Sequence, residues 1–297
     1  MAHLLKPLDQ QVMVITGASS GIGLATALAA AERGAKVVLV ARNADTLGMI
    51  VDEMVEAGGD AVMVAVDVAD RDAVEEIVDC ALDRYGRIDT WVNNAGVSVY
   101  GMIEEVAIED HRRIFETNFW GVVNGSLAAL PHLRQGGGAL INVGSEVSDA
   151  VVPLQGMYSS SKHAVKGFTD ALRVEVEEVE EAPVSITLIQ PTAVNTPFPE
   201  NARNYMARQP KLPSPMIDPT KVAEAILDAA TKGGRDVTVG AIAKLDTFVA
   251  KVWPSLSDKL SALQVNRQHR DAAPHDSDGN LYRPTPGGHI HGESRAP

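Results

Sequence analysis

The chain has 297 residues, of which 45% are hydrophobic, so it can bury the core of one large α/β domain. Its 39 acidic and 26 basic residues give a net charge of −13, which disfavours nucleic acid and anionic membranes as partners. A single cysteine, Cys80, excludes an intramolecular disulfide and a cysteine metal cage. No run has the apolar length of a membrane span, so we expect a cytoplasmic protein.

Short runs rich in β-branched residues alternate with amphipathic segments from Val12 to about Gly240. This alternation is typical of repeated βα units around a parallel sheet. Right-handed crossovers then predict an α/β fold, a single doubly wound Rossmann-type domain whose mainly parallel, seven-stranded sheet has helices on both faces. We predict strands at 12–16, 36–41, 61–66, 88–93, 139–144, 184–190 and 236–239.

The segments between these strands carry the capping residues of helices. Asn43 precedes one apolar stripe, and Asp70 and Gly86 bracket another. Asp218 stands before Pro219, which is an N-cap followed by proline at the first helical position. The sequence therefore indicates helices that begin after Asn43, Asp70 and Asp218, the second of which ends at Gly86.

Two segments break the rhythm of strands and helices. Residues 191–219 are rich in proline around a short possible helix at 200–208, and we interpret this long connection as a lid over the substrate. The domain ends near residue 262, and residues 263–297 are expected to be an extended or disordered tail. The tail histidines lack metal-ligand spacing, so we predict no metal site; they are His269, His275, His289 and His291.

A glycine-rich stretch, Thr16 to Gly23, lies between the first predicted strand and an alanine-rich helix. Glycines allow a tight turn and close approach to a pyrophosphate, and a helix N-terminus offers unpaired N–H groups. The stretch therefore predicts dinucleotide binding. Its predicted contacts are Gly17, Ser19, Ser20, Gly21, Ile22 and Gly23.

Tyr158 and Lys162 are four residues apart, so on a helix they share one face. A lysine cation beside the phenol would lower the pKa of Tyr158 and favour the tyrosinate. Ser145 follows the fifth predicted strand, at the same sheet edge as the glycine-rich stretch. A tyrosine and a lysine at this spacing are more often a buried ring and a solvated charge, and only the surrounding motifs favour an acid/base site.

The TGxxxGIG pattern closely resembles the short-chain dehydrogenase/reductase family when it is combined with further motifs. These motifs are the stretch from Asn93 to Gly96, together with Asn118, Ser145, Tyr158 and Lys162. The resemblance spans residues 12–239. It implies that the chain is an NAD(P)-dependent oxidoreductase acting on CH–OH groups, in which the cofactor moves the hydride.

The resemblance also implies a role for each catalytic position. Tyr158 would exchange a proton with the carbonyl or alcohol oxygen, and Ser145 would hydrogen-bond that oxygen. Lys162 would bind the ribose hydroxyls and lower the pKa of Tyr158. Asn118 would hold a water in a proton relay, although a buried asparagine that bonds only the backbone is the alternative.

The remaining cofactor contacts follow from the same resemblance. Asp67 and Val68 match the pair that contacts the adenine. Asn94, Ala95 and Gly96 match the strand end beside the cofactor. Pro191, Val194 and Thr196 match the segment near the nicotinamide. Thr192 stands where the family usually has glycine, and its Cβ is expected to narrow the pocket.

Arg42 decides between the two nicotinamide dinucleotides. The second predicted strand ends without an acidic residue that could accept from a ribose 2′-OH, and Arg42 stands where a 2′-phosphate could be clamped. We therefore predict NADP(H) as the preferred cofactor, with NAD(H) possible. The alternative is that Arg42 is a solvated charge.

We thus predict an enzyme that interconverts a ketone or aldehyde and an alcohol. An apolar-leaning small-molecule substrate is suggested by Val147, Val151, Val152, Leu154, Met157, Phe198, Tyr205 and Met206. The alternative is a non-catalytic dinucleotide-binding or sensing protein on the same fold. The resemblance further implies a homodimer or homotetramer that associates through helices near 108–133 and 157–180.

Overall fold

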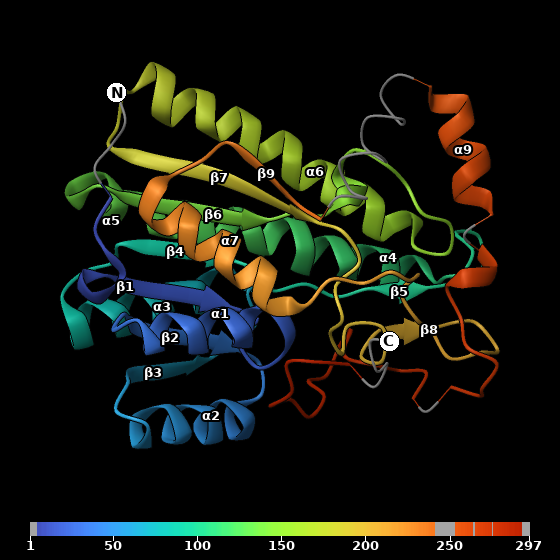
Figure 1. The fold of residues 1–297 in the computed structure, drawn as a ribbon, viewed down its shortest axis with the longest axis horizontal. Coiled ribbons are helices and arrows are strands. Elements are labelled where there is room, and N and C mark those ends of the chain that lie inside the picture. The colour runs from blue at the N-terminus through green and yellow to red at the C-terminus, as the bar shows by residue number, and fades with distance from the viewer. Residues whose placement is uncertain (1–4, 241–252, 264, 275, 293–297) are drawn as a thin grey trace.

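The computed structural model describes residues 5–240, 253–263, 265–274 and 276–292 (Figure 1). Its central sheet has seven strands in the order β3-β2-β1-β4-β6-β7-β9, and every neighbouring pair is parallel. The predicted doubly wound α/β fold is therefore confirmed. The strands are β1 Val12–Thr16, β2 Lys36–Ala41, β3 Asp60–Ala65, β4 Thr90–Asn93, β6 Gly138–Val143, β7 Val184–Pro191 and β9 Asp236–Val239.

Helices cover both faces of the sheet (Figure 1). One face packs against α1 Gly21–Glu32, α2 Ala44–Glu56 and α7 Pro219–Lys232. The other packs against α3 Arg71–Tyr85, α5 Gly121–Gly136 and α6 Gly156–Arg173. Successive residues of β1 belong to opposite layers, with Met13 and Ile15 in one core and Val14 in the other. This double burial explains the unbroken apolar run of the strand.

The shorter elements connect these layers. They are α4 Ile108–Phe115, the π-helical turns η2 Glu116–Trp120 and η4 Val174–Val179, the 3₁₀ turns η1 Leu8–Gln10, η3 Glu146–Ser148 and η5 Val265–Arg267, and α9 Pro254–Ala262. No helix within the described ranges is long and apolar enough to cross a membrane.

The predicted helix caps form as expected. The side chain of Asn43 accepts from the N–H of Thr46 at 3.0 Å, and that of Asp218 accepts from the N–H of Thr220 at 2.9 Å. Asp70 caps α3 in the same way, and Gly86 ends α3 with a left-handed φ of 75°. The local capping signals thus fix where these helices begin and end.

The helix expected at 200–208 is wrong. Residues Arg203–Asn204 instead form a short strand, β8, that pairs in parallel with β5 Val99–Tyr100. The N–H of Tyr205 donates to the carbonyl of Tyr100 at 2.8 Å. Backbone groups that a helix would satisfy internally are thus bonded to a distant segment.

The tail packs against residues 191–219, the segment that the sequence led us to interpret as a lid. The N–H of Lys211 donates to the carbonyl of Gln268 at 2.9 Å, and the N–H of Asn204 donates to the carbonyl of Ser277 at 2.9 Å. The tail then returns beneath β8 toward α1 and α2 (Figure 1). Residues of the lid and of the tail therefore lie side by side at one end of the molecule.

Candidate active site

One pocket lies beyond the carboxyl ends of the strands, where the strand order reverses between β1 and β4. Gly23 and Asn118 are the only predicted site residues that do not line it. The predicted residues that do are Gly17, Ser19, Ser20, Gly21, Ile22, Arg42, Asp67, Val68, Asn94, Ala95, Gly96, Ser145, Tyr158, Lys162, Pro191, Val194 and Thr196.

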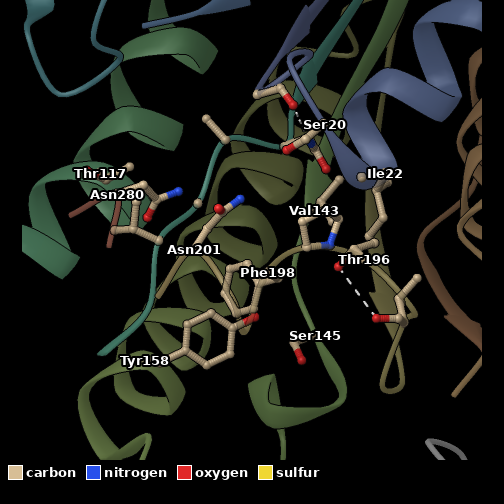
Figure 2. Close-up of a pocket in the computed structure, with 18 of the residues that line it drawn as sticks. Ser20, Ile22, Thr117, Val143, Ser145, Tyr158, Thr196, Phe198, Asn201 and Asn280 are labelled. Carbon is tan, nitrogen blue, oxygen red and sulfur yellow. Dashed lines mark hydrogen bonds between the residues drawn. The ribbon is translucent and has the colours of Figure 1, made fainter. Parts of the chain in front are cut away.

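Tyr158 and Lys162 lie one turn apart near the start of α6, as their spacing predicts. The ammonium nitrogen of Lys162 is 5.8 Å from the centroid of the Tyr158 ring and donates to the carbonyl of Val143 at 2.8 Å. Ser145 lies two residues after the end of β6, and Figure 2 shows its hydroxyl close to that of Tyr158. Strand β6 and helix α6 therefore bring the three predicted groups together.

Burial governs the pKa of both titratable groups. It raises the pKa of Tyr158 to about 12, against the opposing effect of a hydrogen bond with Ser145. It lowers the pKa of Lys162 to about 8. The sequence led us to expect that Lys162 lowers the pKa of Tyr158, but desolvation is the largest influence on this phenol.

Asn118 lies in the π-helical turn η2 and is fully buried. Its Oδ1 accepts from the N–H of Val97 at 2.8 Å, and its Nδ2 donates to the carbonyl of Val97 at 3.0 Å and to Ser161 Oγ at 3.1 Å. A Cβ built on Gly96 would lie 3.5 Å from Asn118 Oδ1 and 4.0 Å from Lys162 Nζ. Asn118 thus joins the segment after β4 to the helix that carries Tyr158 and Lys162.

The glycine-rich loop packs tightly against the end of β4. A Cβ on Gly23 would lie 2.2 Å from the carbonyl oxygen of Gly17, which no side chain could tolerate. Asn94 Nδ2 donates to the carbonyl of Thr16 at 2.9 Å and fixes the loop from the β4 side. Ser20 precedes α1 without a side-chain capping bond, so the first-turn N–H groups take acceptors from elsewhere, and that of Gly21 donates to the carbonyl of His289 at 3.0 Å. This arrangement fits the pyrophosphate of a dinucleotide.

Arg42 lines the pocket, and Arg113 lies near Arg42 without lining the pocket. Arg42 donates to the carbonyl of Leu281 at 3.3 Å and to that of Asn280, and burial lowers its pKa. Asp67 forms an ion pair with Arg113, a residue that the sequence did not single out. These contacts join residues that are far apart in the chain, so no local pattern could have revealed them.

Apolar side chains also surround the space near Tyr158. The ring of Phe198 lies 5.5 Å from that of Tyr158, centroid to centroid, and Val147 and Val152 also line the cavity (Figure 2). Val151 is exposed, and Tyr205 packs against a separate core cluster. Only part of the apolar set expected from the sequence therefore surrounds the space near Tyr158.

Thr192 is accommodated in place of the family glycine. Its N–H donates to the carbonyl of Val239 at 3.0 Å, and its methyl group lies against Gly240. A Cβ on Gly240 would lie only 2.5 Å from that methyl carbon. A glycine at the end of β9 thus provides room for the side chain, although Thr192 still lines the pocket.

The described parts of the chain contain no group of three or more His, Cys, Asp or Glu side chains that could hold a metal ion. Of the tail histidines, His291 pairs with Asp218 at 2.9 Å, and His275 lies outside the described residues.

Comparisons with known proteins agree on one family. The family model described as short chain dehydrogenase matches residues 11–207. The uncharacterized oxidoreductase YxnA of Bacillus subtilis is 47% identical over 271 residues, which are 90% of this chain and 76% of that protein.

Two solved structures share the fold. The alcohol dehydrogenase of Thermococcus sibiricus, complexed with 5-hydroxy-NADP, has a TM-score of 0.67 and 30% identity over 77% of this chain and 94% of its own. A short chain dehydrogenase/reductase of Burkholderia phymatum, in complex with NAD, has a TM-score of 0.72 and 27% identity over 90% of this chain and 99% of its own.

Proposed function

The chain belongs to the short-chain dehydrogenase/reductase family, and we propose that it interconverts a ketone or aldehyde and an alcohol with NADP(H), using Tyr158 as the general acid and base. The family makes it an oxidoreductase that uses a nicotinamide dinucleotide. The observation that carries the proposal is the meeting of Tyr158, Ser145 and Lys162 in the pocket that the glycine-rich loop also lines.

The geometry supports separate roles for the cofactor and the side chains in this pocket. When bound, the nicotinamide supplies or accepts the hydride. The hydroxyls of Ser145 and Tyr158 meet the carbonyl oxygen, and Tyr158 transfers its proton to that oxygen as negative charge develops. Because burial raises the pKa of Tyr158 to about 12, the phenol keeps this proton until the oxygen requires it.

Lys162 and Asn118 position these groups. The bond from Lys162 to the carbonyl of Val143 ties α6 to the end of β6, just before Ser145. Lys162 also lines the pocket, where its ammonium can meet the ribose hydroxyls. The bonds of Asn118 to Val97 and Ser161 set the same helix against the segment after β4.

The preference for NADP(H) rests on Arg42. No acidic side chain stands at the end of β2, and Arg42 lines the pocket beside Asp67. A guanidinium can bind a phosphate through two parallel hydrogen bonds. One solved relative is in complex with NAD and another with 5-hydroxy-NADP, so the relatives favour neither cofactor. The proposed preference for NADP(H) is therefore supported by Arg42.

The proposed homodimer or homotetramer would cover exposed apolar side chains on the helices named by the family resemblance. Ile108, Trp120, Leu127 and Val174 are each about half exposed. Light scattering is expected to give a mass of two or four chains, and a monomer would contradict this association.

Replacing Tyr158 with phenylalanine tests the proposed chemistry. The variant keeps the ring that packs on Phe198 and removes only the hydroxyl. We expect turnover of carbonyl substrates to fall by roughly 10²-fold or more, while the Kd for NADPH changes by less than about threefold.

Tyr85→Phe is the matched control, because its hydroxyl bonds Asp60 at 3.0 Å outside the pocket. This control should turn over like the wild type. Unchanged turnover in Tyr158→Phe would refute the catalytic assignment. Wild-type protein that binds NADPH but turns over no carbonyl or alcohol would instead support the non-catalytic alternative.

A further inference from the structure

Residues 279–291 of the tail, here called the strap, run along the pocket. Asn280, Pro284, Thr285 and Pro286 line the same pocket as Tyr158 and Lys162. Figure 2 shows Asn280 at the edge of that pocket, beside Asn201 and Thr117. The strap lies outside the matched family region, which ends at residue 207.

Both ends of the strap are anchored on different elements. Leu281 is fully buried in a cluster with Val97, Val99 and Ile114, and the hydroxyl of the adjacent Tyr282 donates to Asp110 of α4 at 2.8 Å. At the other end, His291 pairs with Asp218, the N-cap of α7. The strap therefore spans from one wall of the crevice to the other.

Between these anchors the strap bonds to the loops that recognise the cofactor. The N–H of Gly288 donates to the carbonyl of Ser19 at 2.8 Å, and the N–H of Gly21 donates to the carbonyl of His289 at 3.0 Å. Asn43 Nδ2 donates to the carbonyl of Thr285 at 3.2 Å. The strap thus pairs with the loop after β1 and with the loop after β2.

The strap also orients the proposed phosphate-binding arginine. Arg42 donates to the carbonyls of Asn280 and Leu281, and Arg113 Nε donates to the carbonyl of Leu281 at 3.1 Å. A guanidinium has five N–H donors, so Arg42 keeps donors beyond these two bonds. Its remaining N–H groups can still meet a phosphate.

Glycine allows the strap to approach the glycine-rich loop. A Cβ on Gly287 would lie 2.5 Å from the carbonyl oxygen of Ser19. The chain nevertheless leaves a cavity beneath it, because strap residues line the pocket together with the loop. The strap therefore forms part of the wall of this cavity.

We propose that the strap is a wall of the cofactor site that retains the adenosine half of the bound dinucleotide, so that the cofactor leaves only after the strap detaches. This inference rests on the proposed function, because it assumes that a nicotinamide dinucleotide occupies the pocket. The opposite arrangement is a plug that competes with the cofactor for the N–H of Gly21 and for Arg42.

Deletion of residues 279–297 tests the proposal, with deletion of residues 293–297 as the matched control. NADPH is bound to each protein and displaced by excess NADP⁺ while the fluorescence is followed in a stopped-flow instrument. We expect the dissociation rate to rise by about tenfold or more in the longer deletion only, since several hydrogen bonds over the cofactor are lost. An unchanged rate overturns the proposal, and slower dissociation identifies a plug.

Leu281→Ala and Tyr282→Phe cover the case in which the longer deletion does not fold. Each weakens one anchor of the strap, and faster NADPH dissociation is expected from both. Hydrogen exchange supplies a second readout on the wild type, because the N–H groups of Asn280 and Gly288 bond to Asn201 and Ser19. NADPH should slow their exchange if the strap is a wall, and faster exchange would contradict it.

The outcomes separate this inference from the function on which it rests. Wild-type protein that binds neither NADPH nor NADH overturns the proposed function and the strap together. Wild-type protein that binds and turns over NADPH, with dissociation unaffected by every strap variant, overturns the strap alone.

Discussion

The neutral forms of Tyr158 and Lys162 are the forms that burial favours. The pKa of Tyr158 rises to about 12, and that of Lys162 falls to about 8. A phenol that holds its proton suits carbonyl reduction, in which the tyrosine is the acid. The charge of Lys162 should therefore affect the free energy of unfolding near neutral pH.

Lys162→Met removes this charge and tests its effect on stability. The pKa of Lys162 is about 8 in the folded chain and 10.5 in the reference state, so the unfolded chain binds more protons between these values and stability rises with pH there. Below pH 8 the full penalty, about 3 kcal/mol, is present. We expect urea unfolding to show a stability advantage of the variant over wild type that is larger at pH 7 than at pH 9.5. A difference that is independent of pH would contradict the shift.

Arg42→Ala tests the cofactor preference. Loss of a charge-assisted contact to the 2′-phosphate should weaken NADPH binding by roughly thirtyfold, or about 2 kcal/mol, while NADH binding changes much less. Fluorescence titration with both cofactors gives the ratio. Equal weakening of both would mean that Arg42 serves only the strap carbonyls of Asn280 and Leu281.

Helix α1 and the loop before it act as one unit, because the helix meets the loop at a residue without a side chain. A Cβ on Gly23 would collide with the carbonyl of Gly17 at 2.2 Å. Gly23→Ala is therefore expected to destabilise the fold by about 1–3 kcal/mol and to abolish NADPH binding. Thermal unfolding and cofactor titration check the two effects.

Gly48→Ala in α2 is the matched control, because a Cβ there meets nothing within 4 Å. It should stabilise the helix by up to about 1 kcal/mol and leave cofactor binding intact. If both variants behave alike, the close packing of α1 is not what the site requires.

The main elements were predictable because their signals are local. Strand β1 and the cap at Asn43 match the prediction at the residue level, and β4 starts at Thr90, two residues after the predicted start. The strands β5 and β8 have two residues each, too few for any periodicity. The helix predicted at 200–208 is wrong because Arg203–Asn204 pair with the distant strand β5. This pairing overrides the helical preference of the local sequence.

The predicted site residues lie together because of the topology of the sheet. Parallel strands place all of their carboxyl ends at one edge, so motifs that follow β1, β4 and β6 must meet there. Arg113, Asn280 and Thr285 escaped prediction because their contacts span long stretches of chain. The tail is polar and rich in glycine and proline, so its sequence carries no pattern that indicates where it docks.

Asp110 of α4 contacts two segments that are far from it in the chain. Its buried carboxylate accepts from the hydroxyl of Tyr205 in the lid at 2.7 Å and from that of Tyr282 in the tail at 2.8 Å. It also forms an ion pair with Arg203. Helix α4, the lid and the tail are thus held by one side chain.

Asp110→Ala should loosen the lid and the tail together. Removing the carboxylate leaves Arg203 and two hydroxyls without their partner, at a cost of about 2–4 kcal/mol. Hydrogen exchange is expected to rise both at 203–205 and at 279–283, whereas Glu109→Ala, on the exposed side of α4, should change neither. Faster exchange in only one segment would show that the two are held independently.

The proposed reaction is hydride transfer to a carbonyl carbon, with a proton from Tyr158. NADPH that carries deuterium at the transferred position, mixed with a panel of ketones and aldehydes, tests this directly by mass spectrometry of the products. We predict deuterium on the new carbinol carbon with wild-type protein and almost none with Tyr158→Phe at the same cofactor occupancy. Deuterium that stays on the cofactor with wild-type protein, across a panel that binds, would contradict the account.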